Sequence, residues 1–293
     1  MADVRSMLRS IANCSNRSNR SRLQRKVIMS RLAIGYYHAI GLSGNQDELL
    51  YHTSRRLGRA AGRACAFALP RGVFCGILAG VMKDILAGCR LYGIVDMGYV
   101  RPDEVAQCTR RLLALGVRVL QLRAKGVPLP EVLRLARVVL PLCRDAGALF
   151  ILNDYPEAAA EVGAHGVHVG QDAGPLAAVR RVVGEDLLVG RSTHSLEQVR
   201  GAVAEQADYI GFGPLFPTGT KPGRPAIGLL DIREAHRLAG AMPIFCIGGV
   251  NLETLPAVLA AGAHRVVVVS WLLRACAEGR DAELRRLLEL LTA

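Results

Sequence analysis

Two threonines and a lysine lie close together in a stretch rich in glycine and proline. The sequence FGPLFPTGTKPG, residues 212–223, follows an apolar run and contains Thr218, Thr220 and Lys221. Backbone N–H groups, small hydroxyls and an ammonium are the groups with which proteins bind a phosphate or a diphosphate. An ordinary solvated surface loop has a similar composition, because Gly, Pro and Thr are common in loops without a ligand. The rest of the sequence is needed to choose between an anion-binding loop and an ordinary surface loop.

The composition indicates a globular protein with an unevenly distributed charge. The chain has 293 residues, 51% of them hydrophobic, and a formal net charge of +12. Residues 1–88 hold 14 of the 37 Lys and Arg and 4 of the 25 Asp and Glu, a net charge of +10, which leaves +2 for residues 89–293. The basic charge therefore belongs to the N-terminal part of the chain, and we expect no nucleic-acid partner for the remainder.

The cysteines and the apolar runs favour a cytoplasmic protein. The eight cysteines include no C-x-x-C pair, and several lie in apolar periodic runs, so we expect reduced thiols and no zinc site. The best candidate for a membrane span, the uncharged apolar run of residues 72–82, has 11 residues and lies between Arg71 and Lys83, which is too short. No apolar segment or cleavage signal typical of a secreted protein follows the basic N-terminus.

Residues 1–88 differ from the rest of the chain in pattern. They contain a tract of Ser, Asn and Arg at residues 13–26, followed by a basic region rich in Gly and Ala. We expect a basic, poorly patterned N-terminal extension that is weakly ordered, or an over-extended gene model whose natural start is Met82. A tail that binds RNA or acidic lipid is the alternative.

From residue 89 onward, short β-rich runs alternate with amphipathic helical patterns. Eight strand and helix units in about 200 residues predict an α/β protein with a closed (β/α)8 TIM barrel over residues 89–293. An open doubly wound sheet is the alternative, but it needs a Gly-rich first turn that the sequence lacks. The expected strands cover residues 89–95, 118–122, 149–153, 166–169, 187–192, 209–213, 244–248 and 265–269.

Polar clusters follow most of the expected strands. In a TIM barrel the catalytic groups lie at the carboxyl ends of the strands and in the loops after them. Seven clusters fall at such positions, which loop composition alone does not explain. They are QLRAK at 121–125, NDY at 153–155, HVGQD at 168–172, STH at 192–194, PTGTK at 217–221, GGV at 248–250 and SW at 270–271.

Eight sequence pieces in order resemble the thiamine-phosphate synthase family, over residues 89–275. They are LYGIVD, QLRAK, ILNDY, GVHVGQD, GRSTHS, ADYIGFGPLFPTGTK, IGGV and VVVVS. The resemblance implies a (β/α)8 transferase that joins 4-amino-2-methyl-5-hydroxymethylpyrimidine diphosphate to 4-methyl-5-(2-phosphoethyl)thiazole. The products are thiamine phosphate and pyrophosphate, and the implied cofactor is Mg²⁺.

The resemblance also implies roles on the pyrimidine side of the site. Arg123, Lys125 and Lys221 would hold the diphosphate and act in catalysis together with Ser192, although such cations otherwise extend into solvent. Gln121 would hydrogen-bond the aminopyrimidine, because an amide both donates and accepts. The implied residues for the pyrimidine diphosphate are Gln121, Leu122, Arg123, Ala124, Lys125, Asn153, Ser192 and Lys221.

A second set of residues would bind the thiazole phosphate. Two glycines, Gly248 and Gly249, would leave room for a phosphate against backbone N–H groups, in the manner of barrel phosphate sites after strands 7 and 8. Close packing of strand and helix is the alternative reason for this glycine pair. The implied residues for the thiazole phosphate are Thr218, Gly219, Thr220, Gly249, Val269 and Ser270.

The implied metal ligands are Asp154 and Asp172, since Mg²⁺ prefers one or two carboxylates together with substrate oxygens. Here the sequence departs from its relatives, because Ala173 stands where their second aspartate is expected and Asp172 lies one residue earlier. Either Asp172 reaches the ion through a shifted loop or a water, or metal binding is weakened. Tyr155 also stands where an arginine is frequent.

Two histidines are ambiguous, and they bear on the alternative functions. His194 is either a catalytic group or a residue that caps the next helix, and His168 is expected to be a core histidine. A thiazole tautomerase on the same fold would use His194 for proton transfer, and a non-catalytic barrel with an RNA-binding tail is a further alternative. The synthase reaction would be a dissociative substitution without a side-chain nucleophile. A homo-oligomer is possible.

Overall fold

The computed structural model describes residues 71–218 and 225–292, with side chains from residue 80 onward. The chain divides into two units, Met1–Val81 and Met82–Ala293. The second unit contains every described element except the first part of helix α4. Most of the expected extension, residues 1–88, therefore lies outside the described residues.

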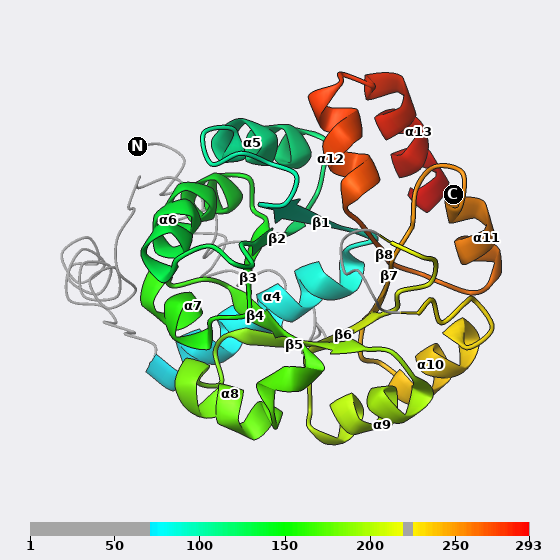
Figure 1. Cartoon of the computed structure of the whole chain (residues 1–293). Helices are drawn as coiled ribbons and strands as arrows, with labels where there is room; N and C mark the ends of the chain where they lie inside the picture. The colour runs from blue at the N-terminus through cyan, green and yellow to red at the C-terminus, as the bar shows by residue number, and fades with distance from the viewer. Residues whose placement is uncertain (1–70, 219–224, 293) are drawn as a thin grey trace, which may run out of the picture. The chain divides into compact units, whose positions relative to one another are not determined.

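Eight strands form a closed parallel barrel in sequential order (Figure 1). This result confirms the predicted TIM barrel and excludes the open doubly wound sheet. The observed strands agree with the expected ones to within two residues at either end. They are β1 (Leu91–Asp96), β2 (Val119–Arg123), β3 (Leu149–Asn153), β4 (Gly166–Val169), β5 (Leu188–Thr193), β6 (Tyr209–Phe212), β7 (Ile244–Ile247) and β8 (Val266–Val268).

The barrel closes because β1 pairs with both β2 and β8. Leu91 is aligned with Val266, and Asp96 at the other end of the same strand is aligned with Arg123 of β2. All six residues of β1 are buried. Strands of this kind are almost continuously apolar, because the barrel interior covers one face and the helices cover the other.

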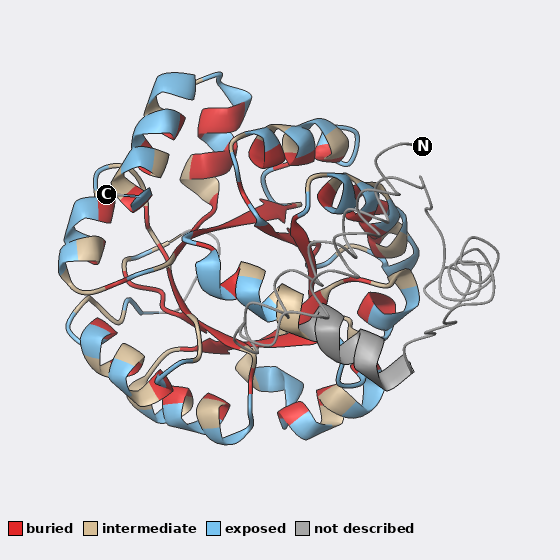
Figure 2. Cartoon of the chain, turned by 180° about the vertical axis from the view of Figure 1, so that it is seen from behind, coloured by how far each residue is buried: buried red, intermediate tan, exposed pale blue. Residues whose placement is uncertain are grey.

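The helices surround the strands with their apolar faces turned inward (Figure 2). In α6, for example, Val132, Leu135, Ala136 and Val139 are buried at the spacing of one helical face. The described helices are α4 (Arg71–Gly88), α5 (Val105–Ala114), α6 (Leu129–Asp145), α7 (Pro156–Val162), the 3₁₀ helix η1 (Gln171–Ala173), α8 (Leu176–Val183), α9 (Leu196–Ala204), α10 (Ile232–Ala239), α11 (Leu255–Ala260), α12 (Ser270–Ala277) and α13 (Asp281–Thr292).

The sequence did not predict α4, since its Gly- and Ala-rich pattern has no clear helical period. The residues of α4 that belong to the barrel unit contact the amino-terminal ends of the strands. Leu86 is buried in the core, and Nζ of Lys83 lies 2.9 Å from Oδ1 of Asp208, the residue before β6. Among the described residues, no helix is long and apolar enough to cross a membrane.

The five cysteines whose side chains the structure describes are free thiols. Cys89, Cys143, Cys246 and Cys276 are buried, and Cys108 is half-buried. Burial raises the pKa of Cys143 and of Cys246 to about 12, because an apolar environment disfavours the thiolate. These thiols therefore behave as small apolar core groups.

Gly190 of β5 makes room for the ring of Tyr209 on β6. A Cβ at residue 190 would lie 2.1 Å from Cζ of Tyr209. Gly190→Ala should therefore lower the free energy of unfolding by about 3 kcal/mol, since an overpacked barrel has to shift a buried ring. Urea denaturation measures the effect.

Gly201→Ala is the matched control, because a Cβ there meets nothing within 4 Å on the exposed side of α9. This change should stabilise the protein by about 0.5 to 1 kcal/mol, since alanine favours a helix over glycine. Equal effects of the two substitutions would show that Tyr209 does not need the space above Gly190.

Candidate active site

A cavity of about 470 Å³ opens at the carboxyl ends of the barrel strands. Its floor is made by side chains of the strands themselves, and its wall is made by the loops after β6 and β7 and by the start of α12. This is the rim where the sequence predicted the polar clusters to meet. Its lining includes the predicted residues Gln121, Arg123, Asn153, Ser192, Thr218, Gly249, Val269 and Ser270.

Other predicted residues lie near the cavity without lining it. Leu122 and Ala124 are buried, and they alternate along the strand with Gln121 and Arg123, so their side chains point away from the barrel interior. Only their backbone groups could contact a ligand. Lys125 is exposed in the loop after β2. The predictions for Gly219, Thr220 and Lys221 fall outside the described residues.

Arg123 is held at the rim by a buried carboxylate that the sequence analysis did not single out. Its Nη1 donates to Oδ2 of Asp96 at 2.8 Å, and the two side chains are 13% and 2% exposed. The backbone N–H of Gly98 donates to the other Asp96 oxygen at 2.9 Å. Because the bond from Nη1 to Asp96 fixes the orientation of the planar guanidinium, the other N–H groups of Arg123 are available for a second anion.

Asn153 and Asp154 form the rim after β3. Nδ2 of Asn153 donates to Oδ2 of Asp154 at 2.7 Å, and the backbone N–H of Asp154 donates to the carbonyl of His168 at 2.8 Å. Asp154 and Tyr155 have φ values of 59° and 54°, so the chain turns sharply at this point. Backbone strain of this kind often accompanies a functional site.

The second predicted metal ligand lies on the neighbouring strand's loop. Asp172 is exposed in η1, directly after β4, and β4 pairs with β3. Nη1 and Nη2 of the buried Arg191 donate to the carbonyls of Gly170 and Gly174 at 3.0 and 2.8 Å, which fixes both ends of this loop.

Within the described part of the chain, no three His, Cys, Asp or Glu side chains gather into a metal site of their own. Two carboxylates at adjacent strand ends nevertheless offer the hard oxygen ligands that Mg²⁺ prefers. This ion commonly takes its remaining ligands from water and from substrate phosphates. The donor set therefore fits a magnesium ion that binds together with a diphosphate.

The glycine pair after β7 allows two loops to pack closely. Gly248 and Gly249 have φ values of 101° and 68°, and a Cβ at either residue would lie within 2.6 Å of the loop that follows β6. The backbone N–H of Phe216 also donates to the carbonyl of Gly248 at 3.1 Å. The pair therefore packs against another loop and not against a helix as the alternative expected, and both glycines line the cavity beside Ser270 at the start of α12.

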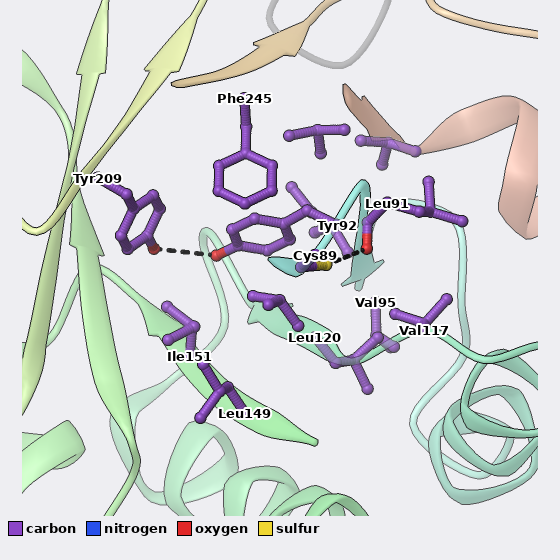
Figure 3. Close-up of a cluster of buried hydrophobic side chains, with 14 of the residues drawn as sticks. Cys89, Leu91, Tyr92, Val95, Val117, Leu120, Leu149, Ile151, Tyr209 and Phe245 are labelled. Atoms are coloured by element: carbon purple, nitrogen blue, oxygen red, sulfur yellow. Dashed lines mark hydrogen bonds between the residues drawn. The ribbon is translucent and has the colours of Figure 1, made fainter. Parts of the chain in front are cut away.

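Aromatic side chains form a floor that sequence reasoning missed. Tyr92, Tyr209 and Phe245 line the cavity, and both tyrosines contact Phe245 edge to face (Figure 3). Buried aromatic residues within apolar strands look like ordinary core in a sequence, so no local signal separates them from it. Trp271, from the predicted cluster at 270–271, also lines the cavity, and so does Arg274 of α12, which the sequence analysis did not single out.

The structure corrects the interpretation of one histidine and refines that of the other. His168 is only half-buried and lines the cavity, so the expectation of a core histidine was wrong. The side chain that caps α9 belongs to Ser195, which accepts from the N–H of Gln198 at 3.2 Å. The ring of His194 lies at the cavity and contacts the carbonyl of Gly213.

A closed barrel with a cavity at the carboxyl ends of its strands is typical of TIM-barrel enzymes, whose active sites lie at this rim. A family model described as "Thiamine monophosphate synthase" matches residues 91–272. The chain belongs to this family, as the resemblance predicted, and it forms thiamine phosphate by the condensation that its relatives catalyse.

Several named relatives support the assignment. A thiamine-phosphate synthase of Acidothermus cellulolyticus is 46% identical over 201 residues, which cover 68% of this chain and 92% of that protein. One of Thermus thermophilus is 48% identical over 168 residues, covering 57% and 80% of the two chains. A solved thiamine phosphate pyrophosphorylase from Pyrococcus furiosus aligns with a TM-score of 0.62 and 28% identity over 72% of this chain and 97% of that one.

The Asp96 and Arg123 pair should matter for stability as well as for the site. Asp96→Ala should lower the free energy of unfolding by about 3 kcal/mol, because it leaves a largely buried guanidinium without its partner. Arg123 keeps some contact with solvent, which places the effect at the lower end of the usual range. Urea denaturation measures this change.

Asp103→Ala is the control, since its ion pair with Arg101 is exposed on both sides. It should change the free energy of unfolding by about 0.5 kcal/mol or less. A loss at Asp96 no larger than that at Asp103 would contradict the structural importance of the buried pair.

Proposed function

We propose that the cavity is the site of the condensation and that it binds both phosphorylated substrates at once. The pyrimidine diphosphate would lie over β2, β3 and β5, and the thiazole phosphate would lie against the loops after β6, β7 and β8. The observation that carries the proposal is that Gln121, Arg123 and Asn153 share one cavity with Gly249 and Ser270.

On the pyrimidine side, the described cations and amides have complementary tasks. Arg123 presents the free N–H groups of its guanidinium to the diphosphate, and Asn153 adds an amide donor beside it. Lys125 is exposed in the loop after β2, and a bound diphosphate would attract its ammonium group toward the cavity. We assign the aminopyrimidine ring to Gln121 and Ser192, which line the floor below these groups.

On the thiazole side, we assign the phosphate to the backbone around Gly249 and to the amino-terminal end of α12. Val269 and Ser270 begin that helix, and the first N–H groups of a helix favour an anion. Arg274 lies one helical turn further on and also lines the cavity. We therefore add Arg274 to the proposed phosphate site, together with Thr218 from the loop after β6.

We assign Mg²⁺ to Asp154 and Asp172, in line with the hard oxygen donors on the loops after β3 and β4. The bound ion would neutralise charge on the departing pyrophosphate. The loop that carries Asp172 is tied to Arg191 at both ends. This restraint favours a bridging water over a large shift of the loop as the route by which Asp172 compensates for Ala173.

The proposed reaction is a dissociative substitution. The bond between the methylene carbon of the pyrimidine and the diphosphate oxygen breaks, and the electron pair leaves with pyrophosphate. The thiazole nitrogen then donates its electron pair to the methylene carbon. Arg123 and Asn153 hold the leaving group, the aromatic floor orients the heterocycles, and no side-chain nucleophile takes part.

We further propose that the protein works in the cytoplasm and needs no partner other than its two small-molecule substrates. The free thiols of the described cysteines are compatible with a reducing compartment. We also propose that the protein forms a homo-oligomer. The reaction would not require the basic residues 1–88.

Pyrophosphate release tests the proposed function. The purified full chain should release pyrophosphate with Mg²⁺ only when both the pyrimidine diphosphate and the thiazole phosphate are present. A coupled enzymatic assay measures it, and each substrate alone is the control. Absence of release with both substrates would contradict the synthase and favour a thiazole tautomerase, which forms no pyrophosphate.

Arg274 provides a test of the thiazole side. Arg274→Ala should raise the KM for the thiazole phosphate about tenfold, because it removes one charge-assisted contact with the phosphate. The KM for the pyrimidine diphosphate should stay unchanged. Steady-state kinetics with each substrate varied in turn measures both values.

Arg286→Ala is the matched control, since Arg286 is exposed on α13 and pairs with Glu289. It should leave both KM values unchanged. If Arg274→Ala raised only the KM for the pyrimidine diphosphate, that substrate and not the thiazole phosphate would bind on the side of the cavity near Arg274.

A further inference from the structure

Five side chains on the cavity floor form one continuous chain of hydrogen bonds. Nε2 of Gln121 donates to the hydroxyl of Tyr92 at 2.9 Å, and that hydroxyl lies 3.1 Å from the hydroxyl of Tyr209. The Tyr209 hydroxyl lies 3.2 Å from Nδ1 of His168, and Nε2 of His168 lies 2.9 Å from Oγ of Ser192. All five residues line the cavity.

The chain connects five different strands. Gln121 lies on β2, Tyr92 on β1, Tyr209 on β6, His168 on β4 and Ser192 on β5. Figure 3 shows the contact between the two tyrosines, drawn as a dashed line beside Phe245. The ring of His168 also lies on that of Tyr209, with ring centres 5.4 Å apart and planes inclined by 33°. These contacts hold the chain in one arrangement.

Both phenols keep their protons at neutral pH. Burial raises the pKa of Tyr92 and of Tyr209, because the phenolate would lose its hydration. Each hydroxyl therefore has one hydrogen to donate. A hydroxyl that accepts from one neighbour in the chain therefore keeps a hydrogen that it can give to the next one.

With Gln121 as the first donor, one direction gives each contact of the chain a donor and an acceptor. In this direction Gln121 donates to Tyr92, as the structure has it, Tyr92 would donate to Tyr209, and Tyr209 would donate to Nδ1 of His168. His168 is then the neutral tautomer with its proton on Nε2, and it donates to Ser192. The hydroxyl hydrogen of Ser192 is left for the cavity, while the amide oxygen of Gln121 can accept from a ligand.

We propose that Tyr209 and His168 are positioning residues that give the pyrimidine subsite a fixed hydrogen-bond polarity. Gln121 acts as the acceptor of this subsite and Ser192 acts as the donor. An aminopyrimidine matches this polarity, because its exocyclic amine donates and its ring nitrogens accept. This inference rests on the proposed function for the identity of the ligand, but the polarity itself is a property of the free protein.

The packing around Tyr209 and His168 serves the same arrangement. The absence of a side chain at Gly190 gives the Tyr209 ring its place, and a Cβ at Gly211 would lie 3.4 Å from Cε1 of His168. Gly190 of β5 therefore leaves the room that the Tyr209 ring needs, and Gly211 of β6 lies next to the His168 ring. The polarity of the subsite follows from side chains that do not touch the proposed ligand's reacting atoms.

Nitrogen NMR of the ligand-free full chain tests the polarity directly. With ¹⁵N-labelled histidine, the ring of His168 should carry its proton on Nε2 and have an unprotonated Nδ1. The loss of these signals in His168→Gln assigns them. A proton on Nδ1 would mean that the chain runs in the opposite direction, with Ser192 as the acceptor, and would overturn the inference.

Kinetics of Tyr209→Phe tests the consequence for the ligand. The substitution keeps the ring and removes the central hydroxyl, so the KM for the pyrimidine diphosphate should rise about fivefold to tenfold. The KM for the thiazole phosphate should not change. Tyr99→Phe, on the partly exposed loop after β1, is the control and should leave both values unchanged.

Equal effects of Tyr209→Phe on the two KM values, or no effect on either, would overturn the positioning role. A wild-type protein that releases no pyrophosphate would instead contradict the proposed function. In that case the tautomer of His168 still confirms or overturns the polarity by itself.

Discussion

Closure of the sheet between β1 and β8 decides where every polar side chain of the site can lie. Eight parallel strands that close on themselves bring eight carboxyl ends to one rim. Residues as distant in sequence as Arg123 and Ser270 thereby line the same cavity. The apolar strands and the inward faces of the helices provide the burial that stabilises this closure. The site depends on the barrel because no single segment contains enough of it.

The cavity combines two kinds of environment that the proposed chemistry requires. Its rim has the guanidinium of Arg123 and the amide of Asn153, which suit a diphosphate, and Asn153 contacts the carboxylate of Asp154. Its floor has aromatic rings and a connected set of hydrogen-bonding polar groups, which suit flat heterocycles. Asp96 contributes to the environment of the rim, because it neutralises part of the positive charge of Arg123 and fixes the orientation of its guanidinium. Without Asp96, the largely buried guanidinium of Arg123 would have an uncompensated charge.

Much of the fold could be predicted from the sequence, because strand and helix periodicities differ and the pattern repeats eight times. Part of the cavity lining could also be predicted, since Gln121, Asn153 and Ser192 lie at or near the carboxyl end of an expected strand. The contact between Asp96 and Arg123 could not, because it depends on the register between two strands. Tyr92 and Tyr209 lie within apolar strands and resemble core residues in the sequence.

The central claim is that one cavity at the carboxyl-end rim holds both substrates in contact. A crystal structure of the full chain with thiamine phosphate, pyrophosphate and Mg²⁺ tests it most directly. We expect pyrophosphate within hydrogen-bond distance of Arg123 and Asn153, and the thiazole phosphate against Gly249 and Ser270. Products bound elsewhere on the protein, with this cavity filled only by water, would contradict the claim.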